Sequence, residues 1–224
     1  MGYEPSEHHP AFEEYSETIF GLAEDGIDVI QARIAERLDV SRPAVSEMIK
    51  RMQESELVQI YDNGIIDLTV DGRVLATTVV RRHRIAECFL TEILGLSWTD
   101  SHHEAGRWEH VISPVVEAAL LRVLNNPQTC PHGNPIPGAG YTAPEGTRPL
   151  VEVQPNGGFT VERIPEELEF QQGQLEFLER SRIVPGQSGT VLSIAPDGTL
   201  TVSMGESAVG IGAFTAARIL VTAN

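Results

Sequence analysis

The 224-residue chain has two cysteines, one lysine and no long hydrophobic run. Two cysteines are too few for a disulfide framework, which favours a cytoplasmic protein with reduced thiols. The apolar runs are too short to cross a bilayer, and no secretion signal is visible. The sequence also lacks zinc-protease, P-loop and dinucleotide-binding motifs. We therefore expect neither an enzyme with a small-molecule substrate nor a membrane partner.

The negative charge of the chain is unevenly distributed. A formal net charge of −16 argues at first against nucleic acid as a partner. Residues 31–84, however, hold 9 Lys or Arg and 8 Asp or Glu, a balance of +1, while the other residues carry −17. Because phosphates repel a negative surface, any DNA contact is expected within residues 31–84.

Residues 29–56 have the pattern of two helices joined by a short turn. Ser41 is the expected N-cap of the second helix, and Pro43 lies in its first turn, where a missing N–H costs nothing. Two strands around the turn at residues 62–64 predict a hairpin directly afterwards. This order predicts a winged helix, although an ordinary helical hairpin is the alternative. The candidate DNA-binding residues are Arg33, Ser41, Arg42, Pro43, Ala44, Ser46, Lys50 and Arg51.

The remaining pattern predicts more helices and then a small sheet. After a polar arm at residues 1–10, helices are expected at 10–24, at 70–94, from a cap at Asp100 or Ser101 to about 111, and from Pro114 onward. These apolar helices are long for so few residues, which predicts packing against a second copy of the chain. Residues 126–148 form a Pro/Gly-rich connector that is typical of a domain boundary.

The tail from about residue 149 is expected to be a small β-barrel with an inserted helix at 166–180. Its strands are predicted at 150–153, 159–164, 189–194, 199–204 and 218–222. The predicted fold class is therefore mainly α with a C-terminal small β-barrel.

Imidazole and carboxylate groups recur at helical spacing in the central part of the chain. They lie four residues apart on one predicted helix and at i, i+7 and i+8 on the next, with a glycine at i+4, so each set shares a face. Nitrogen and oxygen donors of this kind bind divalent transition metals. One such pair alone is usually a salt bridge, but their joint occurrence beside a winged helix indicates a metal sensor. The positions are His83 and Glu87, then His102, Gly106, Glu109 and His110.

Together these features resemble the diphtheria toxin repressor family of metal-dependent transcriptional repressors. The matching stretches are A-R-I-A-E-R-L-D-V-S-R-P-A-V-S, R-R-H-R-I-A-E, H-H-E-A-G-R-W-E-H and N-N-P-Q-T-C-P-H-G-N-P-I-P-G, in the family's order. The resemblance implies a homodimer on palindromic operator DNA. It also implies a winged helix-turn-helix domain at 1–72, a helical metal-binding and dimerisation domain at 73–146, and an SH3-like (FeoA-like) domain at 147–224.

The resemblance further implies two metal sites per chain. The primary site takes Glu14, Gly106 through its backbone carbonyl, Glu109 and His110, with Glu17 and His83 added in manganese-type members. One version of the ancillary site takes His83, Glu87 and His102 with Glu166 and Glu169 from the tail. The other takes Glu87, Cys130 and His132, unless the C-P-H segment is only a rigid turn.

Two departures bear on the metal. Iron-type members of the family have methionine in place of Glu14 and cysteine in place of Gly106, whereas manganese-type members have carboxylates at both positions. A sulfur-free primary site favours Mn²⁺ over Fe²⁺, while Co²⁺, Ni²⁺ and Zn²⁺ are expected to bind in vitro. The sequence thus predicts a Mn²⁺-dependent repressor of metal-homeostasis genes. The alternatives are an iron(II)-dependent repressor of iron uptake genes and a metal-independent DNA-binding or interaction protein.

Overall fold

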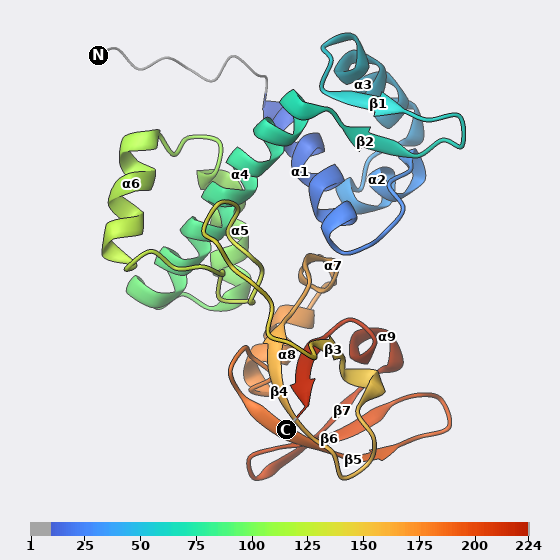
Figure 1. The fold of residues 1–224 in the computed structure, drawn as a ribbon, viewed down its shortest axis with the longest axis vertical. Helices are drawn as coiled ribbons and strands as arrows, with labels where there is room; N and C mark the ends of the chain where they lie inside the picture. The colour runs from blue at the N-terminus through green and yellow to red at the C-terminus, as the bar shows by residue number, and fades with distance from the viewer. Residues whose placement is uncertain (1–9, 224) are drawn as a thin grey trace.

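The protein, seen in a computed structural model that describes residues 10–223, has a helical N-terminal part and a C-terminal sheet (Figure 1). The N-terminal part contains α1 (Pro10–Glu24), α2 (Gln31–Leu38), α3 (Arg42–Glu54), β1 (Val58–Ile60), β2 (Ile66–Leu68), α4 (Val70–Cys88), the π-helical η1 (Phe89–Ile93), α5 (Trp98–Trp108) and α6 (Pro114–Val123). Residues 1–9 of the predicted arm lie outside the described residues, and Pro10 already belongs to α1. None of the helices within residues 10–223 is long and apolar enough to cross a membrane.

The C-terminal part is a six-stranded antiparallel sheet with the strand order β3-β8-β4-β5-β6-β7. Its elements are β3 (Arg148–Pro149), the 3-10 helix η2 (Leu150–Glu152), β4 (Gly158–Arg163), α7 (Glu166–Glu169), α8 (Gln174–Arg180), β5 (Ser188–Ile194), β6 (Leu200–Met204), β7 (Ser207–Ile211), α9 (Ala213–Ala216) and β8 (Leu220–Ala223). Among the described residues, edge strands β3 and β7 are not paired with each other, so the SH3-like sheet is open. The predicted fold class is confirmed.

The winged helix forms where the sequence predicts it. Helix α2 ends at Asp39, whose backbone is left-handed (φ 51°), and the Ser41 hydroxyl accepts the N–H of Ala44 at 3.4 Å to cap α3. Val45 and Ile49 of α3 are completely buried in the core that α3 shares with α1, α2 and the hairpin β1–β2. The opposite face of α3 is left free for solvent or for a nucleic acid.

Helix α4 runs from the winged helix into the helical middle (Figure 1). The Thr69 hydroxyl accepts the N–H of Gly72 at 3.1 Å and caps α4. A Cβ at Gly72 would lie 1.9 Å from the Leu57 carbonyl oxygen, so only glycine lets α4 start against the winged helix. The α-helix stops at Cys88, and η1 replaces the predicted continuation to residue 94.

Helix α5 begins earlier than the sequence pattern predicts. The expected cap at Asp100 or Ser101 is wrong, because the Ser97 hydroxyl accepts the Asp100 N–H at 3.1 Å and donates to the Asp100 carboxylate at 2.8 Å. Ser97 is therefore the N-cap, and α5 starts at Trp98. The helix ends at residue 108, and Glu109 follows as its C-cap while keeping helical backbone angles.

Three details of the tail differ from the prediction. The strand expected at 150–153 is the helix η2. The helix expected at 166–180 is divided into α7, which ends at Glu169, and α8, which begins after the left-handed Gly173 (φ 73°). The pattern also misses β7, which pairs with β6 across a turn at Gly205 (φ 63°).

The Pro/Gly-rich connector is packed between the helical middle and the sheet. The N–H of Ile164 donates to the His132 carbonyl at 2.7 Å, and the Asn134 amide donates to the Ile164 carbonyl at 3.0 Å. Both His132 and Asn134 are almost completely buried. This packing brings connector side chains to α4 and α7, which a free linker would not do.

Buried ion pairs join α1, α4 and the sheet. Arg84 of α4 is 1% exposed and donates to Glu24 at 2.7 Å and to Glu166 of α7 at 2.5 Å. Arg163 of β4 donates to Glu24 and to Asp25, each at 2.9 Å. The end of α1 is thereby held by cations from two other parts of the fold.

Candidate metal centre and DNA interface

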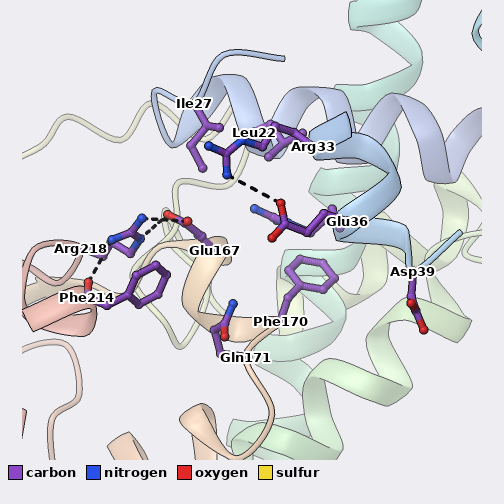
Figure 2. A pocket seen from close by; sticks show the side chains of 11 residues that line it. Leu22, Ile27, Arg33, Glu36, Asp39, Glu167, Phe170, Gln171, Phe214 and Arg218 are labelled. Carbon is purple, nitrogen blue, oxygen red and sulfur yellow. Dashed lines mark hydrogen bonds and ion pairs between the residues drawn. The ribbon is translucent and has the colours of Figure 1, made fainter. Parts of the chain in front are cut away.

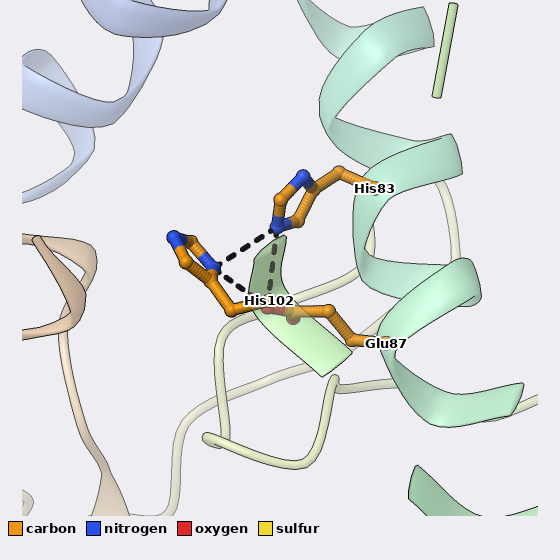
Figure 3. Close-up of side chains that lie close together, drawn as sticks. All are labelled: His83, Glu87 and His102. Atoms are coloured by element: carbon orange, nitrogen blue, oxygen red, sulfur yellow. Dashed lines mark hydrogen bonds and ion pairs between the residues drawn. The ribbon is translucent and has the colours of Figure 1, made fainter. Parts of the chain in front are cut away.

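Three predicted ligands meet where α4 faces α5. His83 Nε2 lies 3.1 Å from a Glu87 carboxylate oxygen and 3.3 Å from His102 Nδ1 (Figure 3). His102 Nδ1 lies 3.0 Å from the same oxygen. His83 and Glu87 lie one turn apart on α4, and Ser97 sets the start of the helix that carries His102. We call His83, Glu87 and His102 the central cluster.

The other nitrogen of His83 faces a second group. His83 Nδ1 lies 2.5 Å from a Glu109 oxygen and 3.8 Å from an oxygen of Glu17, which comes from α1. Glu109 is 3% exposed. We call Glu17, His83 and Glu109 the helix-1 cluster, because it links α1 to the helical middle.

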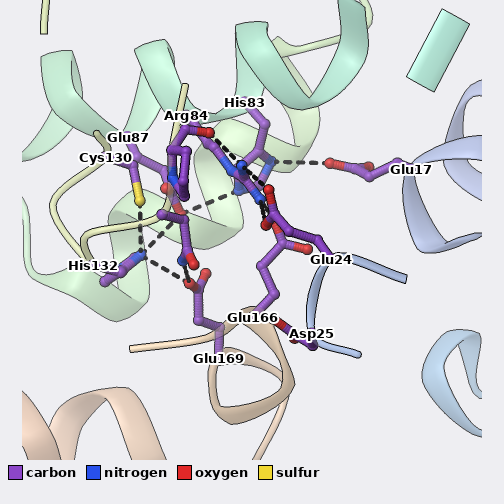
Figure 4. A network of polar contacts seen from close by, with 12 residues as sticks. Glu17, Glu24, Asp25, His83, Arg84, Glu87, Cys130, His132, Glu166 and Glu169 are labelled. Atoms are coloured by element: carbon purple, nitrogen blue, oxygen red, sulfur yellow. Dashed lines mark hydrogen bonds and ion pairs between the residues drawn. The ribbon is translucent and has the colours of Figure 1, made fainter. Parts of the chain in front are cut away.

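A third group lies on the connector side of Glu87. Cys130 Sγ is 3.8 Å from His132 Nδ1, and that nitrogen lies 3.4 Å from Glu87 and 3.3 Å from Glu169 of α7 (Figure 4). Glu169 also lies 3.2 Å from His102. We call Glu87, Cys130 and His132 the connector cluster; Glu169 borders it.

The buried charges in these clusters shift one another's pKa values. Burial and the charge of Glu109 raise the pKa of Glu17 well above its usual range. Burial would also raise the pKa of Glu87, but His132 and His83 outweigh it and hold this pKa well below its usual range. Burial would lower the pKa of His83, yet Glu87 and Glu109 raise it well above its usual value. Carboxylates at this spacing need a positive charge between them, and the donor set fits a divalent cation.

The first helix offers a carboxylate that the sequence pattern did not single out. Glu13 is 2% exposed and lies 2.6 Å from His110 Nδ1. The predicted ligand Glu14 is exposed, although it lines the same cavity of about 230 Å³ as His110 and Gly106. The spacing of Glu13 and Glu17, four residues apart on one helix face, is the signal that could have identified it.

Gly106 lies on the wall of this cavity. A Cβ built on Gly106 would meet no atom within 4 Å, so the cavity is open in front of it.

The two predicted tail ligands take different partners: Glu169 approaches the histidines, whereas Glu166 is held by Arg84. The hydrogen bond that His110 donates to the Glu13 carboxylate raises the pKa of His110.

A second cavity, of about 530 Å³, lies between α2 and the C-terminal part (Figure 2). Some of its charged groups are paired: Arg33 lies 3.7 Å from Glu36 on α2, and Arg218 donates to Glu167 in the C-terminal part. The guanidinium of Arg37 lies over the ring of Phe170, 4.5 Å from its centroid, and so joins α2 to the residue that follows α7. This cavity holds none of the histidines and is separate from the three clusters.

The predicted DNA-facing residues share one property, which is exposure on the winged helix. Val45, Ile49 and Met52 turn inward from α3, so the polar residues between them face outward. The exposed positions are Arg33, Ser41, Arg42, Pro43, Ala44, Ser46, Lys50 and Arg51.

A winged helix joined to buried clusters of imidazole and carboxylate defines a metal-dependent DNA-binding protein. The family "Iron dependent repressor, N-terminal DNA binding domain" matches residues 9–63, and "Iron dependent repressor, metal binding and dimerisation domain" matches residues 69–138. The chain belongs to this family, which includes the diphtheria toxin repressors. It is a metal-dependent transcriptional repressor that binds operator DNA as a dimer, and it is not an enzyme.

Some similar proteins are named after iron and others after manganese. The iron-dependent repressor IdeR of Mycobacterium leprae (strain TN) is 39% identical over 200 residues, 85% of this chain and 86% of that protein. IdeR of Mycobacterium tuberculosis (strain ATCC 25618 / H37Rv) is 50% identical over 126 residues, 56% of this chain and 55% of that protein. A "Manganese-dependent transcriptional repressor complex with manganese" matches with a TM-score of 0.83 at 31% identity, covering 95% of this chain and 100% of the other.

Proposed function

We propose that this chain is a manganese-responsive repressor, active in the cytoplasm when loaded with Mn²⁺, which controls genes of metal-ion homeostasis. The observation that carries this proposal is the donor set of the helix-1 cluster, where Glu17, His83 and Glu109 offer only oxygen and nitrogen. Oxygen-rich, sulfur-free ligation suits a hard divalent ion. A twofold dimer presents two recognition helices, so the operator is proposed to be palindromic.

Iron(II) is the second candidate for the activating metal. The mycobacterial relatives are named iron-dependent, while the structural neighbour is named manganese-dependent. A sulfur donor is offered by Cys130, but it belongs to the connector cluster. Co²⁺, Ni²⁺ and Zn²⁺ are also expected to bind in vitro, because affinity follows the Irving–Williams order. Mn²⁺ and Fe²⁺ are therefore distinguished by the DNA-binding response at a controlled free concentration of each metal, and not by metal affinity alone.

We assign the first ion to the helix-1 cluster together with His110, Glu14 and the backbone carbonyl of Gly106. His83 can serve only one ion, because a neutral imidazole has one lone pair and one N–H. If Nδ1 of His83 binds the first ion, Nε2 carries the proton and donates it to Glu87, 3.1 Å away. The central cluster then cannot hold an ion of its own.

We assign the second ion to the connector cluster, completed by Glu169. These donors include one thiol, one imidazole and two carboxylates, all almost completely buried. Glu166 is tied to Arg84 and is proposed to hold α7 in place instead of binding metal. Two ions per protomer follow from this assignment.

The bound ion supplies positive charge that attracts Glu17 and Glu109 to one point. Without it, the two carboxylates repel each other across the interface between α1 and α5. The ion therefore favours the arrangement in which α1 is held against the helical middle, and this arrangement fixes the spacing of the two recognition helices in the dimer. We propose domain boundaries at residues 72 and 146, and DNA contacts by the exposed winged-helix residues described above.

The test is an anaerobic fluorescence-anisotropy titration of full-length protein on a labelled palindromic operator. At buffered free concentrations of each metal, Mn²⁺ is expected to induce operator binding and Fe²⁺ is not. Chelator is expected to reverse the binding. Glu109→Gln should abolish the response, whereas Glu104→Gln, on α5 with a side chain that is 38% exposed and pairs with Arg107, should preserve it. Binding that ignores chelator contradicts metal control; activation by Fe²⁺ but not Mn²⁺ selects the iron alternative.

A further inference from the structure

Glu13 lies on α1 outside the three clusters and touches one of the proposed ligands. Its carboxylate oxygen is 2.6 Å from Nδ1 of His110. The other ring nitrogen, Nε2, lies 3.3 Å from an oxygen of Glu109. The imidazole of His110 thus stands between a buried carboxylate of α1 and the helix-1 cluster.

We propose that Glu13 is a positioning residue for His110: it accepts the Nδ1–H and so leaves the Nε2 lone pair for the metal ion. This inference rests on the proposed role of His110 as a ligand. A neutral imidazole has one N–H and one lone pair, and the partner of one nitrogen decides which nitrogen binds metal. Such carboxylate–histidine pairs also make the ligating nitrogen more basic.

The geometry distinguishes Glu13 from a metal ligand. The helix-1 cluster consists of Glu17, His83 and Glu109, and Nε2 of His110 faces it, 3.3 Å from an oxygen of Glu109. Glu13 faces the opposite edge of the His110 ring, at hydrogen-bond distance from the nitrogen that points away from Glu109. Its role is therefore to orient a ligand.

Burial makes this contact effective. The side chain of Glu13 is 3% exposed, and that of His110 is 24% exposed. Water therefore reaches Glu13 poorly, and the His110 N–H is the polar partner that compensates the buried carboxylate. Glu14, the next residue, is exposed. The sequence E-E thus contains two carboxylates with different environments, and only the inner one can fix the ring.

The contact also gives α1 a hold on the site that does not depend on the ion. Glu13 belongs to the first turn of α1, and His110 follows the end of α5. The hydrogen bond therefore joins these two elements before metal arrives and orients Nε2 in advance. Removing Glu13 leaves His110 free to rotate or to carry its proton on Nε2, where it blocks the metal.

The test uses the full-length protein with two readouts. Mn²⁺ affinity is measured by electron paramagnetic resonance titration, and the His110 tautomer by ¹⁵N NMR of the Zn²⁺-loaded protein. Wild type should show a proton on Nδ1 and metal on Nε2. Glu13→Ala should lower Mn²⁺ affinity about 10–100-fold. Glu13→Gln, which keeps an oxygen acceptor, should recover part of it, and Glu104→Gln should resemble wild type.

The outcomes separate this inference from the function on which it rests. His110→Ala with unchanged Mn²⁺ affinity would remove His110 from the ligand set, and the proposed site would fail first. If His110→Ala loses affinity while Glu13→Ala and Glu13→Gln both keep it, the positioning role is overturned and the site stands. Metal on Nδ1 of His110 in wild type also overturns it. If Glu13→Ala does not fold in a melting experiment, Glu13→Gln alone decides: wild-type affinity and tautomer ratio sink the proposal.

Discussion

Replacing Arg84 by methionine tests what holds the C-terminal part against α1. The Arg84 side chain is 1% exposed, and its guanidinium donates to Glu24 at 2.7 Å, to Glu166 at 2.5 Å and to the Pro135 carbonyl. Methionine fills similar space but leaves the buried carboxylate of Glu166 and the partly buried carboxylate of Glu24 with less positive charge nearby. Removing one partner from a buried ion pair costs about 3–5 kcal/mol. Arg163 still donates to Glu24 at 2.9 Å, so we expect the lower end, about 3 kcal/mol.

The assay is urea unfolding of the metal-free protein, followed by circular dichroism. With a slope of about 3 kcal/mol per molar urea, a loss of about 3 kcal/mol lowers the midpoint by about 1 M. Arg107→Met is the matched control, since the Arg107 side chain is 75% exposed and pairs with Glu104 of its own helix. An exposed pair of this kind contributes about 0–1 kcal/mol. Equal shifts for the two variants would refute the view that the Arg84 network stabilises the fold.

Three further predictions concern metal and DNA. His110→Ala should lower Mn²⁺ affinity more than about 100-fold and abolish metal-dependent DNA binding, which parallel metal and DNA titrations check. Arg42→Ala should weaken DNA binding and reduce its salt slope by about 1 while leaving metal affinity unchanged; altered Mn²⁺ affinity would contradict this separation. Burial would lower the pKa of His102, but hydrogen bonds to Glu169 and Glu87 raise it to about 9. Below this pH the protonated His102 ring competes with the metal ion for these two carboxylates, so the affinity for the second ion should rise from pH 6.5 toward 9. Isothermal calorimetry across this range checks the prediction, and an affinity that does not change with pH would contradict the competition.

The helix α7 shows how one short element can serve two networks. Glu166 and Glu169 lie three residues apart, and the sequence pattern pairs them as joint tail ligands. In the fold, Glu166 pairs with Arg84 while Glu169 reaches His102 and His132. Arg84→Met should therefore also hold α7, and with it the Glu169 side chain, less firmly in place. Spacing alone could not divide these roles, because it says nothing about which cation approaches each carboxylate.

The local features of the sequence determined much of the fold. Ser41 and Pro43 start α3 by capping and by a fixed backbone angle, which depend only on neighbouring residues. Turn glycines and alternating apolar residues marked most of the sheet. The errors arose where two local signals compete: Ser97 against Asp100 as the cap of α5, and Gly173 inside an otherwise helical pattern.

The sequence by itself determined the donor types and the helices that carry them, because imidazole and carboxylate groups at helical spacing share a face whatever packs against them. Only the tertiary structure decided their partners. It brought Glu13 rather than Glu14 to His110, and it directed the two nitrogens of His83 to different carboxylates. The physical reason is that spacing fixes a direction around one helix axis, whereas distance and burial depend on how α1, α4, α5 and the connector pack together.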